Sequence, residues 1–276
     1  MTWHGHLSLH YTRDGERTIA LDRHHGPLRV LQRLYPEGPG ICHHVLVHPP
    51  GGIAGGDVLE IEARLDPGTH ALITTPSATR FYRSEGVPAA QRVSLQVADG
   101  ARLEWMPLET LAYRGCIAEN RVGLQLAPGG EAMGWDILAL GLPAADAAFD
   151  RGSFLQHLEL SGHWLERGRI DASDTRLLDS PLGWASRRVL ATVWFAAGSE
   201  WPISRRDALL DAARGCSAAS PLAATAGATS PHGRVVVLRA LAERVEPAMA
   251  LLVDVRAAWR RAAWDLAAEP PRIWRT

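Results

Sequence analysis

The sequence predicts a mainly β protein with an irregular, helically wound, solenoid-like architecture of stacked hairpins and two α-helices in its C-terminal third. Four segments alternate apolar and polar residues with period two, and a glycine-containing turn interrupts each of them, as in β-hairpins. These turns recur about every 30 residues, which favours stacked units. A sandwich or barrel would also give many short strands, so the mainly β class is the firmer prediction.

The four predicted units follow one another along the middle of the chain. Each consists of an alternating segment, a turn and a second apolar segment. They run from Leu59 through Asp66-Pro67-Gly68 to Ile73, from Val93 through Asp99-Gly100 to Trp105, from Val122 through Ala127-Pro128-Gly129-Gly130 to Trp135, and from Leu155 through Ser161-Gly162 to Leu165.

Helical patterns occur only in the last third of the chain. The first predicted helix lies near 204–215, where Ser204 supplies a cap and Gly215 a stop. The second lies near 247–266, with Pro247 in its first turn and apolar residues at helical spacing. Between them, 218–233 is rich in small and turn-forming residues and is predicted to be a mobile loop.

Composition indicates a single domain, 1–276, that is β-rich over 1–200. The net charge of −1 gives no sign of a nucleic-acid or membrane-surface partner. All 29 basic residues are arginine, so any chemistry that needs a lysine is excluded. The three cysteines form no CxxC motif and follow no signal peptide, so we expect a reducing, cytoplasmic environment. No apolar run approaches the ~18 residues of a membrane span.

Two histidine clusters are candidate metal ligands. His4, His6 and His10 share one face if the N-terminal segment is a strand, and three imidazoles could hold Ni²⁺ or Zn²⁺. The alternative interpretation is a solvated strand face.

The second cluster is Cys42, His43, His44 and His48. On a strand His43 points away from the other three, so at most three of these side chains can converge. A buried cysteine acting as a small hydrophobe, with its histidines bonded to backbone groups, is an equally good interpretation.

The segment from His48 to Asp57 is the most unusual in the chain, because it holds four glycines within six residues. Glycine allows positive φ angles and close approach of other groups, so we expect a loop of defined shape. Its backbone N–H groups could cradle a phosphate, but no neighbouring Lys, Ser or Thr completes such a motif and Asp57 would repel the anion. Because GxSxG, HExxH and GxGxxG motifs are also absent, we expect no enzymatic activity.

At these residues the chain resembles the urease accessory protein family UreD, also called UreH. The resemblance covers nearly the whole length and includes the segment from His48 to Asp57, Leu103-Glu104-Trp105, Trp135-Asp136 and Pro271-Arg272-Ile273-Trp274. Its most specific motif residues are Pro50, Gly51, Gly52, Gly55, Gly56, Asp57, Phe81, Tyr82 and Arg83. Arg80 stands where many members have lysine, which keeps the charge. The N-terminal histidines are not part of the family pattern.

The resemblance implies a chaperone-like scaffold rather than a catalyst. Similar proteins bind apo-urease together with UreF and, through UreF, the GTPase UreG, so that nickel reaches a buried urease site. The implied fold is an irregular, helically wound β architecture with two helices. The family is also thought to carry a water-filled passage for nickel, so nickel would be bound transiently and no cofactor permanently.

This resemblance suggests particular residues for the passage and for partner binding. Asp57 and Glu166 are predicted to line or gate it, with His48 and Cys42 as weaker candidates. Asp57 has an alternative interpretation as a turn residue that accepts hydrogen bonds from backbone N–H groups. A second hypothesis is a pure interaction platform without metal contact, which docks its partner through Trp259, Ile273 and Trp274.

Overall fold

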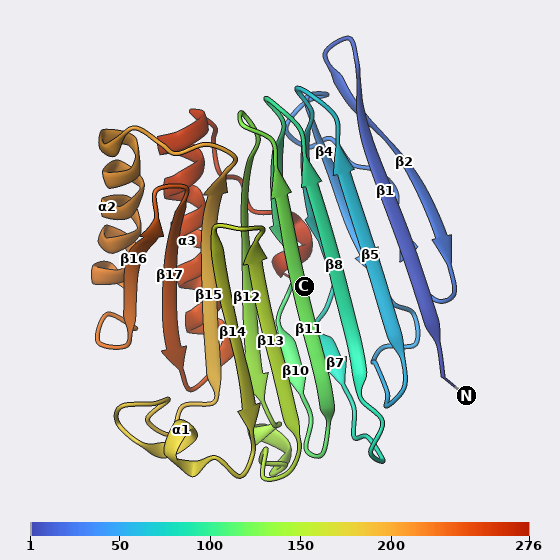
Figure 1. The fold of residues 1–276 in the computed structure, drawn as a ribbon, viewed down its shortest axis with the longest axis vertical. Helices are drawn as coiled ribbons and strands as arrows, with labels where there is room; N and C mark the ends of the chain where they lie inside the picture. Colours follow the sequence, from blue (N-terminus) through green and yellow to red (C-terminus); the bar gives the residue numbers. More distant parts are fainter. Residues whose placement is uncertain (1, 276) are drawn as a thin grey trace.

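A computed structural model describes residues 2–275, apart from the side chain of Ala144. The chain forms three layers, namely a seven-stranded sheet, a ten-stranded sheet and two long helices (Figure 1). Sheet 1 has the order β14-β13-β11-β8-β5-β1-β2, and sheet 2 has the order β16-β17-β15-β12-β9-β6-β4-β3, with β10 and β7 attached beside β12.

The strands of sheet 1 are β1 (His4–Asp14), β2 (Arg17–His25), β5 (Val58–Leu65), β8 (Ala89–Val97), β11 (Ile117–Leu126), β13 (Ser153–Leu160) and β14 (Trp164–Asp171). Those of sheet 2 are β3 (Arg29–Val30), β4 (Ile41–Val47), β6 (His70–Thr74), β7 (Thr79–Phe81), β9 (Arg102–Met106), β10 (Thr110–Ala112), β12 (Glu131–Leu140), β15 (Val189–Ala197), β16 (Ala226–His232) and β17 (Val235–Ala242). The helices are α1 (Thr175–Asp179), α2 (Ile203–Ala219) and α3 (Val245–Trp264), with 3₁₀ turns at Pro143–Ala145 and Arg272–Arg275.

The middle of the chain winds back and forth between the two sheets. Strands β5, β8, β11 and β13 of sheet 1 alternate along the sequence with β6, β9 and β12 of sheet 2. Within each sheet these strands pair in parallel. The predicted mainly β, solenoid-like architecture is therefore confirmed.

The glycine turns differ in one respect from the prediction. The first three join a strand of sheet 1 to a strand of sheet 2, whereas the fourth closes an antiparallel hairpin between β13 and β14. The early turns stack on one another: Gly100 has a φ of +66°, and its N–H donates to the Gly129 carbonyl at 3.1 Å. Alternation reports which side of a strand is buried and not which strand it pairs with, so it could not separate the two cases.

Both predicted C-terminal helices are present, but the end of the first helix and the segment between the two helices differ from the prediction. Helix α2 continues past Gly215 to Ala219, because Ala213 and Ser217 are buried and packing outweighs the weak helix propensity of glycine. The prediction of a mobile loop over 218–233 is wrong in its second half, which forms β16 at the edge of sheet 2. Pairing with β17 overrides the turn-forming composition there.

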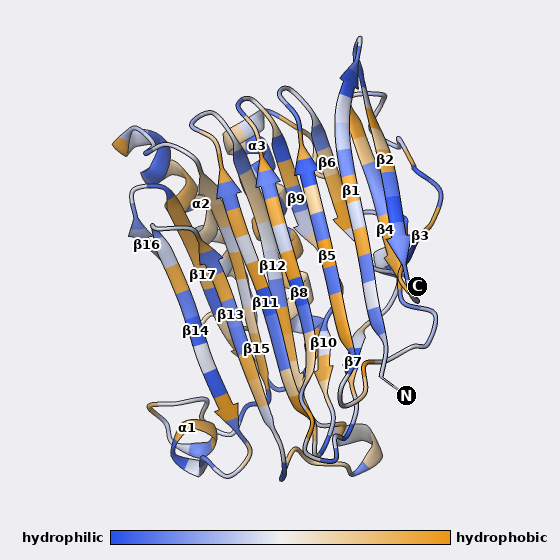
Figure 2. Ribbon diagram, turned by 45° about the vertical axis from the view of Figure 1, so that its right-hand side comes forward, coloured by the Kyte–Doolittle hydropathy of each residue, from blue (hydrophilic) through white to orange (hydrophobic). Residues whose placement is uncertain are grey.

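Two apolar cores separate the three layers. One lies between the sheets and includes Leu7, Leu59 and Phe154, and the other lies between sheet 2 and helices α2 and α3 and includes Trp135 and Trp259. Hydropathy alternates along β5 and β11 of sheet 1, whose outer face is uncovered (Figure 2). Strand β12 of sheet 2 is buried on both faces, as expected for a sheet covered on each side. None of the described helices is long and apolar enough to cross a membrane.

Candidate functional site

A row of polar side chains crosses the interior between the two sheets. Gln91, Asn120 and Gln156 lie directly opposite one another on β8, β11 and β13. All three occupy the inward-facing positions of their strands. The other buried inward residues of these strands are apolar, namely Ala89, Val93, Leu95, Val97, Ala118, Val122, Leu124, Phe154, Leu158 and Leu160. One polar rung therefore interrupts an otherwise apolar interior, and such rungs require internal hydrogen-bond partners.

Asp136 on β12 closes this row from the opposite sheet. Asn120 Nδ2 donates to Asp136 Oδ2 at 2.8 Å, and Gln91 Nε2 donates to Asn120 Oδ1 at 3.2 Å. Burial raises the pKa of Asp136 to about 6, and the Glu166 carboxylate adds to this effect, while hydrogen bonds from Gln156 and Asn120 oppose it. Asp136 is 7% exposed. It is thus a buried carboxyl group bonded to amides, and it can change protonation near neutral pH.

Glu166, a predicted passage residue, lies on β14 opposite Leu158, two residues from Gly168, which lies opposite Gln156 at the end of the row. Its charge still acts on Asp136. Arg239 Nε of β17 lies 2.9 Å from both of its carboxylate oxygens, and Arg239 Nη2 contacts Oε2 as well. This pair joins the edge of sheet 1 to sheet 2. Both side chains are partly exposed, so the Glu166 end of the row reaches solvent.

The other end of the row reaches the glycine segment. A cavity of about 70 Å³ lies there, with Gln91 in its wall together with His48, Gly51, Gly52 and Arg80. Burial lowers the pKa of His48, and the nearby Asp57 charge opposes this effect. The row and the cavity therefore share Gln91 and form one polar region between the sheets.

Asp57 lies buried beside the glycine segment, with 5% of its surface exposed. Its Oδ1 accepts a hydrogen bond from the Trp3 N–H at 2.8 Å, and its Oδ2 accepts one from the Ala54 N–H at 2.9 Å. Its own N–H donates to the Ala54 carbonyl at 2.9 Å. These contacts are those of a turn residue, as the alternative interpretation proposed, and the gating role of Asp57 remains a prediction.

The two halves of the motif pack against each other as one unit. The Ile53 N–H donates to the Arg80 carbonyl at 2.7 Å, and the Tyr82 N–H donates to the Ile53 carbonyl at 2.9 Å. A Cβ on Gly52 would lie 2.2 Å from the Tyr82 ring, so only glycine fits there. Phe81 is fully buried, whereas Pro50 is exposed and the Arg83 side chain is 69% exposed beside Glu85.

The candidate ligands of the second histidine cluster do not converge. Cys42 and His44 face the core between the sheets, where His44 Nδ1 bonds the Tyr11 hydroxyl at 2.6 Å. His43 faces the helical layer and pairs with Glu37, and His48 lies beyond the end of β4. Within residues 2–275, no three His, Cys, Asp or Glu side chains are grouped so as to hold a metal ion.

The N-terminal histidines share the outer face of β1, as predicted. Each forms its own pair with an acidic residue of the neighbouring chain segment. The pairs are His4 with Glu60 at 2.9 Å, His6 with Glu62 at 3.6 Å and His10 with Asp66 at 2.9 Å. They form three separate surface ion pairs on an exposed sheet.

The residues predicted to bind a partner lie in and on the helical layer. Trp259 is completely buried and its Nε1–H donates to the Leu209 carbonyl at 2.8 Å, so it packs α3 against α2. Trp274 is half-buried against Trp135, and its Nε1–H donates to the Thr74 hydroxyl at 2.8 Å. Ile273 beside it is half-buried too.

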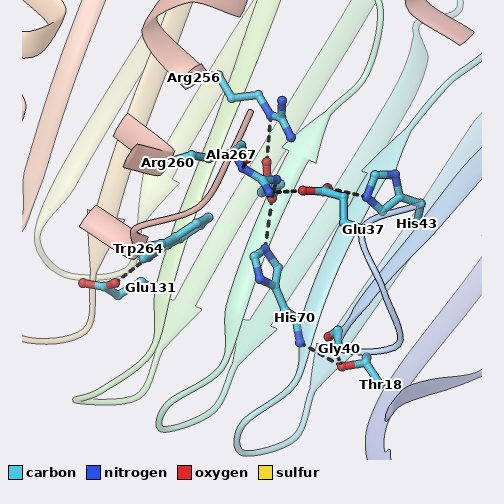
Figure 3. A network of polar contacts seen from close by, with 11 residues as sticks. Thr18, Glu37, Gly40, His43, His70, Glu131, Arg256, Arg260, Trp264 and Ala267 are labelled. Atoms are coloured by element: carbon cyan, nitrogen blue, oxygen red, sulfur yellow. Dashed lines mark hydrogen bonds and ion pairs between the residues drawn. The ribbon is translucent and has the colours of Figure 1, made fainter. Parts of the chain in front are cut away.

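A second buried carboxylate, Glu104 on β9, lies on the helical side of sheet 2. Arg256 Nε is 2.7 Å and Arg260 Nη1 is 2.5 Å from its oxygens, and His70 Nε2 is 2.9 Å away. Figure 3 shows Arg256 and Arg260 of α3 and His70 of β6 pointing toward one another, and a dashed line joins Arg260 to Glu37 as well. Burial alone would raise the pKa of Glu104, but Arg256, His70 and Arg260 hold it far below its ordinary value.

Sequence reasoning overlooked the polar row, although a signal for most of it was present. Gln91, Asn120 and Gln156 share the parity of the apolar positions in their strands, so alternation places all three inside. Asp136 carries no such signal because β12 is buried on both faces.

Comparison with known proteins gives one consistent result. The family model described as UreD urease accessory protein matches residues 4–275. The chain is 64% identical over 278 residues to the urease accessory protein UreD of Leptothrix cholodnii, with complete coverage of both chains. It is 61% identical to the protein of that name from Verminephrobacter eiseniae and 58% identical to that from a Polaromonas species, with 99% of each chain covered in both cases.

Proposed function

Because the chain belongs to the UreD urease accessory protein family, we propose that it is a non-catalytic scaffold that helps pass nickel to the urease active site. Membership of this family supports a chaperone-like role in urease maturation. In the proposed assembly the chain binds apo-urease together with UreF, and through UreF the GTPase UreG, in the cytoplasm. Nickel is the cargo and occupies the chain only transiently.

The buried polar row carries this proposal. From the cavity beside His48, the row offers amide and carboxylate groups through Asn120 and Asp136 to Glu166 at the solvent. Nickel accepts carboxylate and carbonyl oxygens, and it accepts imidazole nitrogen such as that of His48 at the cavity. A carboxyl group with a pKa of about 6 is mostly ionised near neutral pH, so it can meet a cation without first losing a proton. Asp136 is therefore suited to brief contact, with Asp57 and Glu166 as the proposed gates.

Substitution of Asp136 tests the proposal. We expect Asp136→Asn to leave binding to UreF and apo-urease intact and to lower the nickel content of urease matured with it. The measurement is nickel per active site in urease purified after co-expression, with pull-down of the partners alongside. The matched control is Asp66→Asn, which removes a surface carboxylate paired with His10. Unchanged nickel content with Asp136→Asn would rule out the route through the row.

A pure interaction platform is the second candidate, and one observation favours it. Both gate carboxylates are already engaged, Asp57 by two backbone N–H groups and Glu166 by Arg239. In this case Ile273 and Trp274 would contact the partner and no metal would enter. Nickel titration of the full chain separates the candidates: binding that Asp136→Asn or His48→Ala weakens favours the route, and the platform predicts none.

A further inference from the structure

We propose that the cavity beside the glycine segment binds a small monovalent oxyanion of the size of bicarbonate, with Arg80 as its positive partner. The cavity is lined by the glycine segment, by the end of β4 and by the segment that leads into β7. The site shares its cavity with the start of the proposed nickel route, but it does not rest on that proposal, because its ligand is an anion and its main group is a cation.

Arg80 supplies the charge. It lines the cavity, and its Nε is buried without any hydrogen-bond partner. Among the ion pairs of residues 2–275, none includes Arg80, although most other partly buried arginines of the chain have a carboxylate neighbour. Buried guanidinium N–H groups are normally satisfied, so an unpaired one on a residue that lines a cavity points to an acceptor that the chain does not provide.

The backbone supplies a second donor. The N–H of Gly51 donates to the His48 carbonyl and that of Ile53 donates to the Arg80 carbonyl, whereas no acceptor within the described chain takes the N–H of Gly52. Gly52 must stay glycine because the Tyr82 ring covers its Cα. Gly52 lines the same cavity as Arg80, and a peptide N–H together with a guanidinium group is a common arrangement for holding oxyanions.

Folding removes the two objections that the sequence raised against an anion at this segment. The missing hydroxyl groups come from a later part of the chain, since Ser77 and Thr79 line the cavity with Arg80, whereas the Thr75 hydroxyl already donates to the Ser77 carbonyl. The carboxylate of Asp57 accepts hydrogen bonds from two N–H groups, and Asp57 is not among the lining residues. The anion would therefore meet Arg80 before it meets a negative charge.

Size and charge restrict the ligand. A volume of about 70 Å³ admits a planar anion of three or four heavy atoms. Arg80 is the one permanently charged side chain among the lining residues, so it balances the charge of the anion. A monovalent planar anion fits these conditions better than sulfate or doubly charged phosphate.

Anion titration of the full-length chain tests the site. We expect saturable broadening of the ¹³C resonance of bicarbonate at pH 8 and constant ionic strength, with formate competing and sulfate at least about tenfold weaker. Arg80→Gln should weaken bicarbonate binding about tenfold or more, because a charged hydrogen bond is lost, and Arg80→Lys should largely retain it. The matched control is Arg83→Gln, an exposed arginine of the same segment, which should bind like the wild type.

A second variant removes the space instead of the charge. Ala78 lines the cavity, so Ala78→Leu should fill it and abolish binding while Arg80 stays in place. Circular dichroism of each variant identifies any that fails to fold. If Arg80→Gln fails to fold, the comparison of the wild type with Ala78→Leu still tests whether bicarbonate binds in the cavity. The proposal is overturned if bicarbonate gives no saturable effect, if Arg80→Gln and Ala78→Leu bind normally, or if sulfate binds more tightly than bicarbonate.

Discussion

Glu104 and Asp136 are buried carboxyl groups on neighbouring strands of one sheet, and their surroundings give them opposite properties. Glu104 faces the helices and contacts Arg256, Arg260 and His70, so its pKa is depressed. Asp136 faces the other sheet and its hydrogen-bond partners are amides, so its pKa rises to about 6. Burial disfavours the charge of both, and the presence of cations decides the outcome.

These different surroundings suit Glu104 to a structural role and Asp136 to a functional one. The Glu104 network joins β9 to α3, and its carboxylate and two guanidinium groups are charged at neutral pH, so it fixes the helical layer on sheet 2. Asp136 lacks a cation of its own, which leaves it free to meet one that arrives. Carboxyl groups with raised pKa values occur most often at functional sites, in agreement with the proposed role of the polar row.

The largest expected effect on stability comes from removing the charge of Glu104. Glu104→Gln leaves the buried guanidinium groups of Arg256 and Arg260 without their carboxylate, and removal of one partner from a buried ion pair costs about 3–5 kcal/mol. We expect the free energy of unfolding to fall by this amount at pH 7.5. Urea unfolding followed by tryptophan fluorescence measures it.

An exposed pair on the far sheet is the control for that experiment. Glu62→Gln removes the surface partner of His6 and should change the free energy of unfolding by less than about 0.5 kcal/mol. If Glu104→Gln were no more destabilising than Glu62→Gln, the network could not be what holds α3 in place.

Asp136→Asn should raise the free energy of unfolding, whereas Glu104→Gln lowers it. Because the folded-state pKa of about 6 exceeds the unfolded value near 3.9, the folded state binds the proton more tightly. The stability of the wild type therefore falls as the pH rises from about 4 to about 6 and stays low above it. Two pKa units correspond to at most about 3 kcal/mol, so Asp136→Asn should gain roughly 1–3 kcal/mol at pH 7.5.

The pH profile distinguishes this cause from a general packing effect. The unfolding free energies of the wild type and of Asp136→Asn should converge below about pH 4, where both side chains are neutral. A stability difference that stays constant from pH 4 to pH 8 would contradict a raised pKa at Asp136.

The comparison also shows what sequence could predict. Period-two alternation gave the strands, and its parity places Asn120 and Gln156 in the interior. No pattern could join Glu104 to Arg256 and Arg260, which lie 152 and 156 residues further along the chain, because α3 packs on β9 only in the folded state. The cavity at Arg80 was missed for the same reason, since the glycine segment and β7 meet through tertiary contacts.

Among Glu104, Asp136 and Glu166, the smallest stability change is expected for Glu166→Gln, which tests the functional side of the comparison. Its bridge to Arg239 is partly exposed, so its loss should lower the free energy of unfolding by about 1 kcal/mol or less. Removal of the Glu166 charge should also move the pKa of Asp136 downward, because that charge helps to raise it. Carboxyl ¹³C titration by NMR measures the shift.

Glu159→Gln, on the outer face of β13 beside His157, is the control and should leave the Asp136 pKa unchanged. An Asp136 pKa that moved equally in both variants would mean that the row is not electrically coupled to its solvent end, and Glu166 would lose its proposed place as a gate.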